Sequence, residues 1–367
     1  MTILKRLGAL ASIGLLVVAS RSDLAAQGTK LRVIQNSMAG DAVTIIDPAT
    51  SRVVGQIPGI EISNGVAASP DGSRIYVTGE VERALFVADA RTFKVIKKVP
   101  VSGRPSGVAV SKDGKWIYVG IHDQGGTGMD IVDAVSFEVK NLPLEGMGTH
   151  YVFVTPDGKY AMATANGGRG PDAATRNQEG LTLRLVDTET GEYVRKFSGE
   201  GEGGHRVCDF YPNADGSTKW VVCNQGRQSG FVVYDFNTGA IVKRVTLPTA
   251  TEGAEGRVRL RNVSSAQGSP SHGVAVSPDG KLIVVSDRWF NLMHVYSAPD
   301  LTHQYSIPTA PDPFWFAFMP DSKTVYAASA FSDMVAVIDL EQRKEVGRIR
   351  VQTQPKRVIV AMLQVQQ

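Results

Sequence analysis

The chain repeats one pattern of apolar and polar positions: a short apolar segment, a tight polar turn and a second apolar segment. The first copy runs from Gly65 to Gly79 (GVAASPDGSRIYVTG), and further copies begin at Gly107, Tyr151, Arg206, Gly273 and Phe316. Val, Ile, Ala and Tyr fit the buried face of a sheet. In Ser-Pro-Asp-Gly, Pro presets φ, Asp bonds to its own backbone and Gly accepts a positive φ. Each copy therefore predicts a β-hairpin.

A second pattern follows each hairpin: a strand that ends in Asp, a polar turn and another strand. Its copies begin at Asp47, Asp89, Asp133, Asp187, Asp235 and Asp339, with a variant at Asp300. Two hairpins per repeat make four strands, which is one propeller blade. The segments Arg357–Met362 and Leu31–Asn36 would share the remaining blade and close the ring. We expect an all-β, seven-bladed β-propeller with four-stranded antiparallel blades.

The N-terminus has the pattern of a secretory signal peptide. Lys5 and Arg6 precede an apolar run from Leu7 to Ser20, and Ala25 and Ala26 offer a cleavage site. The run is too short for a membrane-spanning helix, which needs about 20 residues. We expect a signal peptide at 1–26, a single propeller domain at 27–367, a periplasmic or secreted protein, and no membrane span after cleavage.

The repeats resemble those of the YVTN-type propellers of bacterial and archaeal surface and periplasmic proteins. The residues that carry this resemblance are Val66–Gly79 (VAASPDGSRIYVTG) and Val274–Asp287 (VAVSPDGKLIVVSD). The resemblance covers nearly all of the mature chain. It implies the fold and, taken alone, a non-catalytic binding or cell-surface module. Its weight for function is small, because propellers host many different functions.

Histidines indicate a site at the mouth of the central channel. By sequence alignment, His150, His205 and His272 stand just before the inner strand of three successive blades, where other blades hold Asn64, Ser106, Trp315 and Lys356. Neutral imidazoles bind Zn, Cu or Fe, and a three-His site leaves a position open for water or substrate. His122 is a candidate fourth ligand. The alternative is that each His only supports the entry of a strand.

Two insertions interrupt the repeat in the same sector, at Ala165–Gly180 and Thr249–Ser271, where they would lie on the mouth face. Arginines gather in the predicted loops of that face, and their planar guanidinium groups suit carboxylate, phosphate or sulfate. Trp289 and Trp315 are expected there as well, either stacked on a ligand or packed under loops. The candidate substrate-binding residues are Arg104, Arg169, Arg227, Arg288, Trp289 and Trp315.

The remaining chemistry of the chain narrows its function. Cys208 and Cys223 face each other across a predicted hairpin, so we expect either a disulfide or two buried thiols. The net charge falls from +3 to +1 once the signal peptide is removed, which gives no support for nucleic-acid binding. The motifs for covalent haem c and for nucleotide-binding P-loops are absent. We expect a monomer.

Two functions remain open from the sequence. One is a metal-dependent enzyme, an oxidoreductase or lyase, that acts on a small anionic substrate at the channel mouth. The other is a non-catalytic module that recognises a protein or glycan partner through the same face. The sequence names neither the metal nor the substrate.

Overall fold

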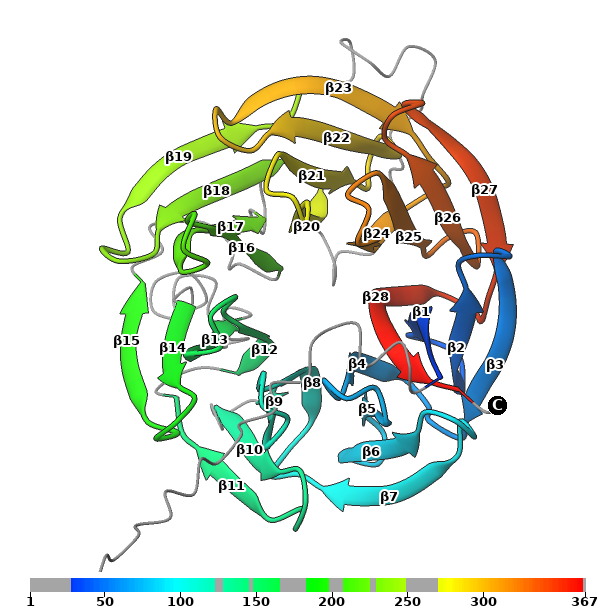
Figure 1. Ribbon diagram of the computed structural model, residues 1–367, viewed down its shortest axis with the longest axis vertical. Coiled ribbons are helices and arrows are strands. Elements are labelled where there is room, and N and C mark those ends of the chain that lie inside the picture. Colours follow the sequence, from blue (N-terminus) through cyan, green and yellow to red (C-terminus); the bar gives the residue numbers. More distant parts are fainter. Residues whose placement is uncertain are drawn as a thin grey trace, which may run out of the picture.

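Seven four-stranded sheets stand around a central channel in the computed structural model of the chain (Figure 1). The structure describes residues 28–122, 128–144, 148–165, 183–197, 207–224, 229–248 and 270–365. These residues form strands and no helix, and so none of them forms an apolar helix of the length that a membrane crossing needs. The predicted seven-bladed propeller is confirmed.

Each blade has the same order of strands from the channel outward, and all its neighbouring strands are antiparallel (Figure 1). The inner strands are β4 (Ser63–Ala68), β8 (Pro105–Val110), β12 (Thr149–Val154), β16 (Cys208–Pro212), β20 (Ser271–Val276), β24 (Pro313–Phe318) and β28 (Pro355–Gln364). The second strands are β1 (Thr29–Ser37), β5 (Arg74–Gly79), β9 (Trp116–Ile121), β13 (Tyr160–Ala165), β17 (Thr218–Asn224), β21 (Leu282–Asp287) and β25 (Thr324–Ser329).

The two outer positions of each blade complete the sheets. The third strands are β2 (Ala42–Asp47), β6 (Ala84–Asp89), β10 (Met129–Asp133), β14 (Leu183–Asp187), β18 (Gly230–Asp235), β22 (Leu292–Ser297) and β26 (Met334–Asp339). The outermost strands are β3 (Arg52–Pro58), β7 (Val95–Pro100), β11 (Val139–Leu142), β15 (Tyr193–Phe197), β19 (Ile241–Thr246), β23 (Thr302–Pro308) and β27 (Lys344–Arg350). We number the blades from blade 1 (β28, β1, β2 and β3) to blade 7 (β24–β27).

Blade 1 is built from both ends of the chain. Its inner strand β28 pairs with β1 over almost the whole length of both, with Val33 opposite Val360 and Ile34 opposite Ile359. This pairing leaves no open edge between the first and last blades. The predicted closure of the ring by the two termini agrees with this pairing.

The Pro-Asp-Gly turns form as their residue types require. In the first copy the Asp71 carboxylate accepts hydrogen bonds from the Ser69 hydroxyl at 2.6 Å and from the Ser73 amide at 3.0 Å. Gly72 has a φ of +70°, which residues with a Cβ rarely adopt. These turns lie between the first and second strands, at the end of the ring opposite the channel mouth.

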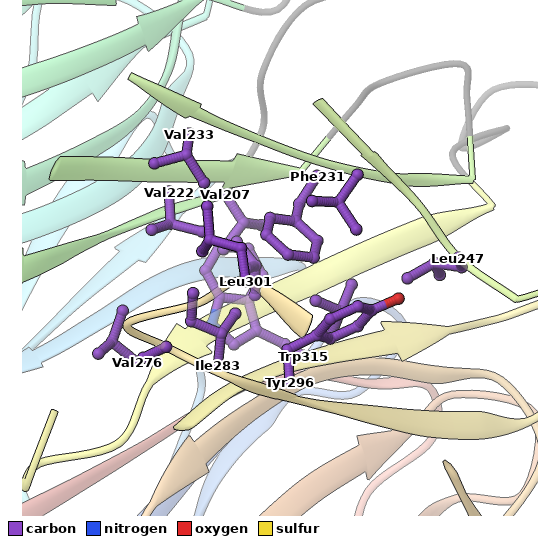
Figure 2. Close-up of a cluster of buried hydrophobic side chains, with 14 of the residues drawn as sticks. Val207, Val222, Phe231, Val233, Leu247, Val276, Ile283, Tyr296, Leu301 and Trp315 are labelled. Atoms are coloured by element: carbon purple, nitrogen blue, oxygen red, sulfur yellow. The ribbon is translucent and has the colours of Figure 1, made fainter. Parts of the chain in front are cut away.

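Apolar side chains fill the seams between neighbouring blades. Figure 2 shows the seam where Val222, Phe231 and Val233 of blade 5 meet Ile283 and Tyr296 of blade 6, all of them buried. Because each blade packs against its neighbours, the ring holds the inner-strand entries at fixed positions around the channel. Those entries form the candidate site.

Candidate functional site

The entry position of each inner strand is set by its register with the second strand. In blades 2, 3 and 6 the first residue of the inner strand pairs with the end of the second strand, and pairing resumes three residues later. The residue after the first is therefore equivalent in each blade. The described residues at this entry position are Asn64, Ser106, His150, His272, Phe314 and Lys356.

This register changes two of the equivalences assumed from sequence. In blade 7 the entry position holds Phe314, and Trp315 is one residue further into the channel. In blade 5 the Val207 amide bonds to the Asn224 side chain at 2.9 Å, as the Gly273 amide bonds to the Ser286 hydroxyl at 2.8 Å. Val207 is thus equivalent to Gly273, one residue away from the alignment that matched His205 with His272. His205 itself lies outside the described residues.

Three large side chains meet at the position after the entry, inside the channel below its mouth. Three blades hold glycine here, Gly65, Gly107 and Gly273, whereas blades 4, 7 and 1 hold Tyr151, Trp315 and Arg357. The Tyr151 and Trp315 rings lie 4.6 Å apart between centroids. The Arg357 guanidinium lies 3.8 Å from the Tyr151 ring centroid and 4.6 Å from that of Trp315. We call these three residues the channel plug.

A glycine makes room for the plug. A Cβ at Gly107 would lie 2.7 Å from the Tyr151 ring and 2.9 Å from the Tyr151 Cα, which is closer than any real Cβ contact. Tyr151 is fully buried, and Trp315 is 5% exposed. The mixture of glycine and large residues at one repeat position therefore places an aromatic floor under the mouth.

A line of polar contacts runs around the mouth from blade 1 to blade 4. The Lys356 ammonium donates to the Asn64 side chain, and the Asn64 amide donates to the Glu80 carboxylate. The other oxygen of Glu80 lies 3.7 Å from Nε of Arg104. Arg104 Nη2 in turn lies 2.7 Å from Nδ1 of His122.

Two imidazoles end this line. The His122 and His150 rings meet edge to face, with centroids 5.7 Å apart. Because a guanidinium can only donate, Nδ1 of His122 accepts the Arg104 hydrogen bond, and the ring is neutral with its proton on Nε2. The mouth therefore presents an N–H donor beside a second imidazole and two cations, a set suited to proton transfer on a small anionic molecule.

The third described histidine of the prediction lies in a different setting. The His272 ring stacks on Phe314 at 3.9 Å between centroids, and the Arg288 guanidinium lies 4.4 Å from the centroid of the same Phe314 ring. Arg288 Nε donates to Asp312 Oδ1 at 2.6 Å and Nη2 donates to Oδ2 at 3.2 Å. The Arg288 charge, predicted to bind substrate, is thus engaged with a carboxylate of the chain.

The other predicted site residues divide into described and undescribed ones. Trp289 is half-buried in the turn after β21, where its amide bonds to the Asp287 carboxylate at 2.9 Å. Arg169 and Arg227, and most of the two insertions, lie outside the described residues. Within the described ranges no group of three or more His, Cys, Asp or Glu side chains is arranged to hold a metal ion. Asn64, Glu80, Tyr151, Lys356 and Arg357 were not predicted to act in the site.

One of the two states expected for the cysteines is present. Cys208 and Cys223 are joined by a disulfide between directly paired residues of β16 and β17. Both are buried, and they contribute to the hydrophobic core between blades 4 and 5.

Known structures share the fold at low sequence identity. Hydrazine synthase from Kuenenia stuttgartiensis matches with a TM-score of 0.64 and 22% identity, over 82% of this chain and 90% of that chain. A 6-phosphogluconolactonase from Bacteroides fragilis matches with a TM-score of 0.68 and 16% identity, over 94% and 99%. The dihydro-heme d1 dehydrogenase NirN matches with a TM-score of 0.58 and 17% identity, over 87% and 63%.

Sequence comparison gives the family directly. Among curated proteins no relative matches the chain. The family described as "Lactonase, 7-bladed beta-propeller" matches residues 66–359, which begin inside the inner strand of blade 2, span blades 3 to 7 and reach into the strand that closes the ring. The chain belongs to the seven-bladed β-propeller lactonase family.

Proposed function

We propose that the channel mouth hydrolyses the ring ester of a small lactone that carries an anionic group. The polar line from Lys356 to His150 is the observation that supports this function, because it places cations, an N–H donor and a second imidazole around one opening. Membership of the lactonase family gives the reaction type. The plug below the mouth shields the reacting group from the rest of the channel.

The charge of the mouth favours an anionic substrate. Lys356 and Arg104 are two cations on the polar line, and Glu80 is its one carboxylate. The Lys356 side chain is largely buried, whereas the Arg104 side chain is 41% exposed and can turn toward a ligand. A phosphate or carboxylate on the lactone would therefore be attracted to this side of the mouth.

The two imidazoles suit two roles in ester hydrolysis, a general base for water and a hydrogen-bond donor to the carbonyl oxygen. In the proposed reaction His150 accepts a proton from water as the water oxygen bonds to the lactone carbonyl carbon. The Nε2–H of His122 donates to the carbonyl oxygen, where negative charge develops. The ring C–O bond then breaks, and the proton passes from His150 to the leaving alkoxide oxygen. The product is the open hydroxy acid.

The function is tested with lactones that differ in charge. Glucono-1,5-lactone and its 6-phosphate are incubated with the purified protein, and acid release is followed by titration at constant pH. A His150→Gln variant is expected to lower kcat about 100-fold, since a general base contributes about 100- to 10,000-fold. The rate of the wild-type protein should fall toward acidic pH, as the imidazole base becomes protonated.

A matched histidine variant controls for unspecific effects. His303 is exposed on the outermost strand β23, away from the channel, so His303→Gln should hydrolyse lactones like the wild-type protein. Equal rates for His150→Gln and the wild-type protein would rule out His150 as the base. No hydrolysis of any lactone, with normal folding, would favour a non-catalytic binding propeller.

A metal-dependent reaction at the mouth is the second candidate. The observation that favours it is the 5.7 Å approach of the His122 and His150 rings, since two imidazoles at one opening begin a ligand set for Cu, Zn or Fe. Metal analysis of protein purified without a His-tag tests it. Stoichiometric metal that is lost in His150→Ala, while the fold is kept, would support it, and metal-free active protein would exclude it.

We also propose that the protein acts in the periplasm or outside the cell. The disulfide between Cys208 and Cys223 supports this location, because disulfides persist in oxidising compartments. Fractionation of cells that express the full chain tests it: N-terminal sequencing of exported protein should begin at or near residue 27. Cytoplasmic protein that keeps residues 1–26 would contradict it.

A further inference from the structure

The channel plug contains a buried cation of unusual surroundings. The Arg357 residue is 8% exposed, and its guanidinium lies over three aromatic rings, with the Phe153 centroid at 6.0 Å in addition to Tyr151 and Trp315. Aromatic faces attract a cation, but they accept no strong hydrogen bond from its N–H groups. The rings therefore cover the guanidinium without satisfying its donors.

Those donors have no partner in the described part of the chain. Nε and Nη1 of Arg357 are buried and make no hydrogen bond. None of the ion pairs among the described residues includes Arg357. Burial lowers the pKa of this guanidinium, and no acidic group among the described residues opposes that effect. A guanidinium nevertheless keeps its charge in proteins, so the described residues leave a charged group without a counter-ion.

The plug contains a second buried donor that has no hydrogen-bond partner among the described residues. The Tyr151 hydroxyl is buried and has no hydrogen-bond partner among the residues described. Buried polar groups without a partner are rare in folded proteins, and each one needs an explanation. Nε of Arg32 and Nε of Arg184 are also buried and make no hydrogen bond with the described residues, but the plug brings two such groups into contact, so both could donate to one ligand group.

We propose that Arg357 binds a carboxylate of the ligand, in a subsite inside the channel below the mouth. The inference rests on the proposed function, since it extends the same site and specifies its substrate. The rings cover the guanidinium, and its buried Nε and Nη1 are the donors left for a ligand. A planar carboxylate pairs with a guanidinium edge, made by Nη2 and either Nε or Nη1, through two parallel hydrogen bonds. The substrate class is thus a lactone with a free carboxylate, whose ring stays at the mouth near His122 and His150.

A pair of lactones that differ only in this group provides the kinetic test. Glucaro-1,4-lactone has a carboxylate where glucono-1,4-lactone has a hydroxymethyl group. The wild-type protein should hydrolyse the carboxylate lactone with a kcat/KM about 10- to 100-fold higher, the effect of one charge-assisted pair. Arg357→Gln should remove this preference, mainly through KM. Arg357→Lys keeps the charge without the fork, and should retain only part of the preference.

Binding without turnover provides the second readout. Calorimetry with glucarate, and with neutral glucitol, measures affinity in the wild-type protein, Arg357→Gln and Arg357→Lys. Glucarate should bind the wild-type protein at least about 10-fold more tightly than either variant, and glucitol should not distinguish them. Arg350→Gln is the matched control, because Arg350 is exposed on the outermost strand of blade 7. Circular dichroism establishes that each variant is folded.

The outcomes separate this proposal from the proposed function. Glucarate binding that depends on Arg357, in a protein that hydrolyses no lactone, would support the subsite and contradict the lactonase activity. Hydrolysis of both lactones with equal kcat/KM, unchanged in both Arg357 variants, would support the activity and overturn the subsite. Glucarate affinities that are the same in all variants would also overturn the subsite.

Discussion

Two buried arginines beside the channel differ in one respect. Arg288 and Arg357 are 2% and 8% exposed, and each guanidinium lies over aromatic rings of the inner strands. Arg288 forms two hydrogen bonds with Asp312, whereas two of the Arg357 nitrogens have no partner among the described residues. The same side chain in similar aromatic surroundings is neutralised by a carboxylate in one case and by none of the described residues in the other.

The difference separates a structural arginine from one that we assign to a ligand. Asp312 has a left-handed conformation, with φ of +58°, and its amide donates a hydrogen bond to the Asn291 side-chain oxygen at 2.9 Å. Ile62 and Gln354, which also precede an inner strand, have a positive φ as well, so the entry of the strand fixes the backbone of the residue whose carboxylate neutralises Arg288. Near the Arg357 guanidinium the described chain places three aromatic rings, and it gives Nε and Nη1 no hydrogen-bond partner. A buried charge that the fold leaves unpaired is a candidate binding group.

The largest expected change in the free energy of unfolding comes from breaking the ion pair between Arg288 and Asp312. Asp312→Asn removes the charge opposite Arg288 but keeps the size of the side chain, and Asn tolerates a positive φ. Loss of one partner of a buried ion pair costs about 3–5 kcal/mol, because the other charge stays buried. Urea denaturation should show this decrease in the free energy of unfolding.

An exposed carboxylate serves as the control for that measurement. Asp41 lies on the surface between β1 and β2, so Asp41→Asn should change the free energy of unfolding by less than about 0.5 kcal/mol. Similar small effects for Asp41→Asn and Asp312→Asn would show that Asp312 does not stabilise Arg288.

Asp209 is a carboxyl that forms no ion pair with any described residue, and it completes the comparison. Asp209, on the inner strand β16, accepts hydrogen bonds from the amides of Val276 and Phe210, both at 2.8 Å. Burial raises its pKa to about 6, although these two hydrogen bonds oppose the rise. In the unfolded chain an Asp titrates near about 3.9. The folded protein therefore keeps a proton between these values that the unfolded chain releases.

The difference between the folded and unfolded pKa of Asp209 sets the direction in which stability changes with pH. The contribution of Asp209 to stability is fully present below the unfolded pKa and is lost as pH rises through about 6. We expect Asp209 to lower the free energy of unfolding by about 2 kcal/mol between pH 4 and pH 7, because the two pKa values differ by about 2 units and one unit corresponds to about 1.4 kcal/mol.

The measurement compares pH slopes, not absolute stabilities. Urea denaturation at a series of pH values should give a flatter profile for Asp209→Asn than for the wild-type protein. Asp41→Asn should keep the wild-type slope. A slope that is the same in all three proteins would contradict the raised pKa of Asp209.

The sequence predicts the fold because each blade repeats the same signals. The Ser-Pro-Asp-Gly turns and the alternating strands recur with little change, and even the segment at Arg357–Met362 reads as an inner strand. The predicted closure follows from counting strands. These features depend on the turn and strand preferences of short segments, which can be recognised in the sequence itself.

The site is less predictable because it depends on register. The inner-strand entries of blades 1–4, 6 and 7 share one β-bulge, but the sequence alignment began blades 5 and 7 one residue off, which exchanged Phe314 for Trp315 and misaligned His205. Arg357 was missed because it stands at the start of an otherwise apolar strand. The clue in the sequence was the repeat position itself, which is glycine in three blades and Tyr151, Trp315 or Arg357 in others.

The smallest effect is expected from removing the unpaired charge. Arg357→Met replaces the guanidinium with an unbranched apolar side chain that adapts to irregular space. The variant no longer buries a charge, and this gain is opposed by the loss of cation–π contacts worth about 0.5–2 kcal/mol. We expect the free energy of unfolding to rise by about 1 kcal/mol, in contrast to the decrease for Asp312→Asn. Urea denaturation measures both variants under the same conditions, with Arg350→Met as the exposed control.

A decrease in the free energy of unfolding of Arg357→Met would mean that Arg357 stabilises the packing of the blades, as Arg288 does in blade 6. A rise, together with loss of the stabilisation that glucarate gives the wild-type protein, is what a group kept for a ligand requires, since binding residues are commonly retained at a cost in stability.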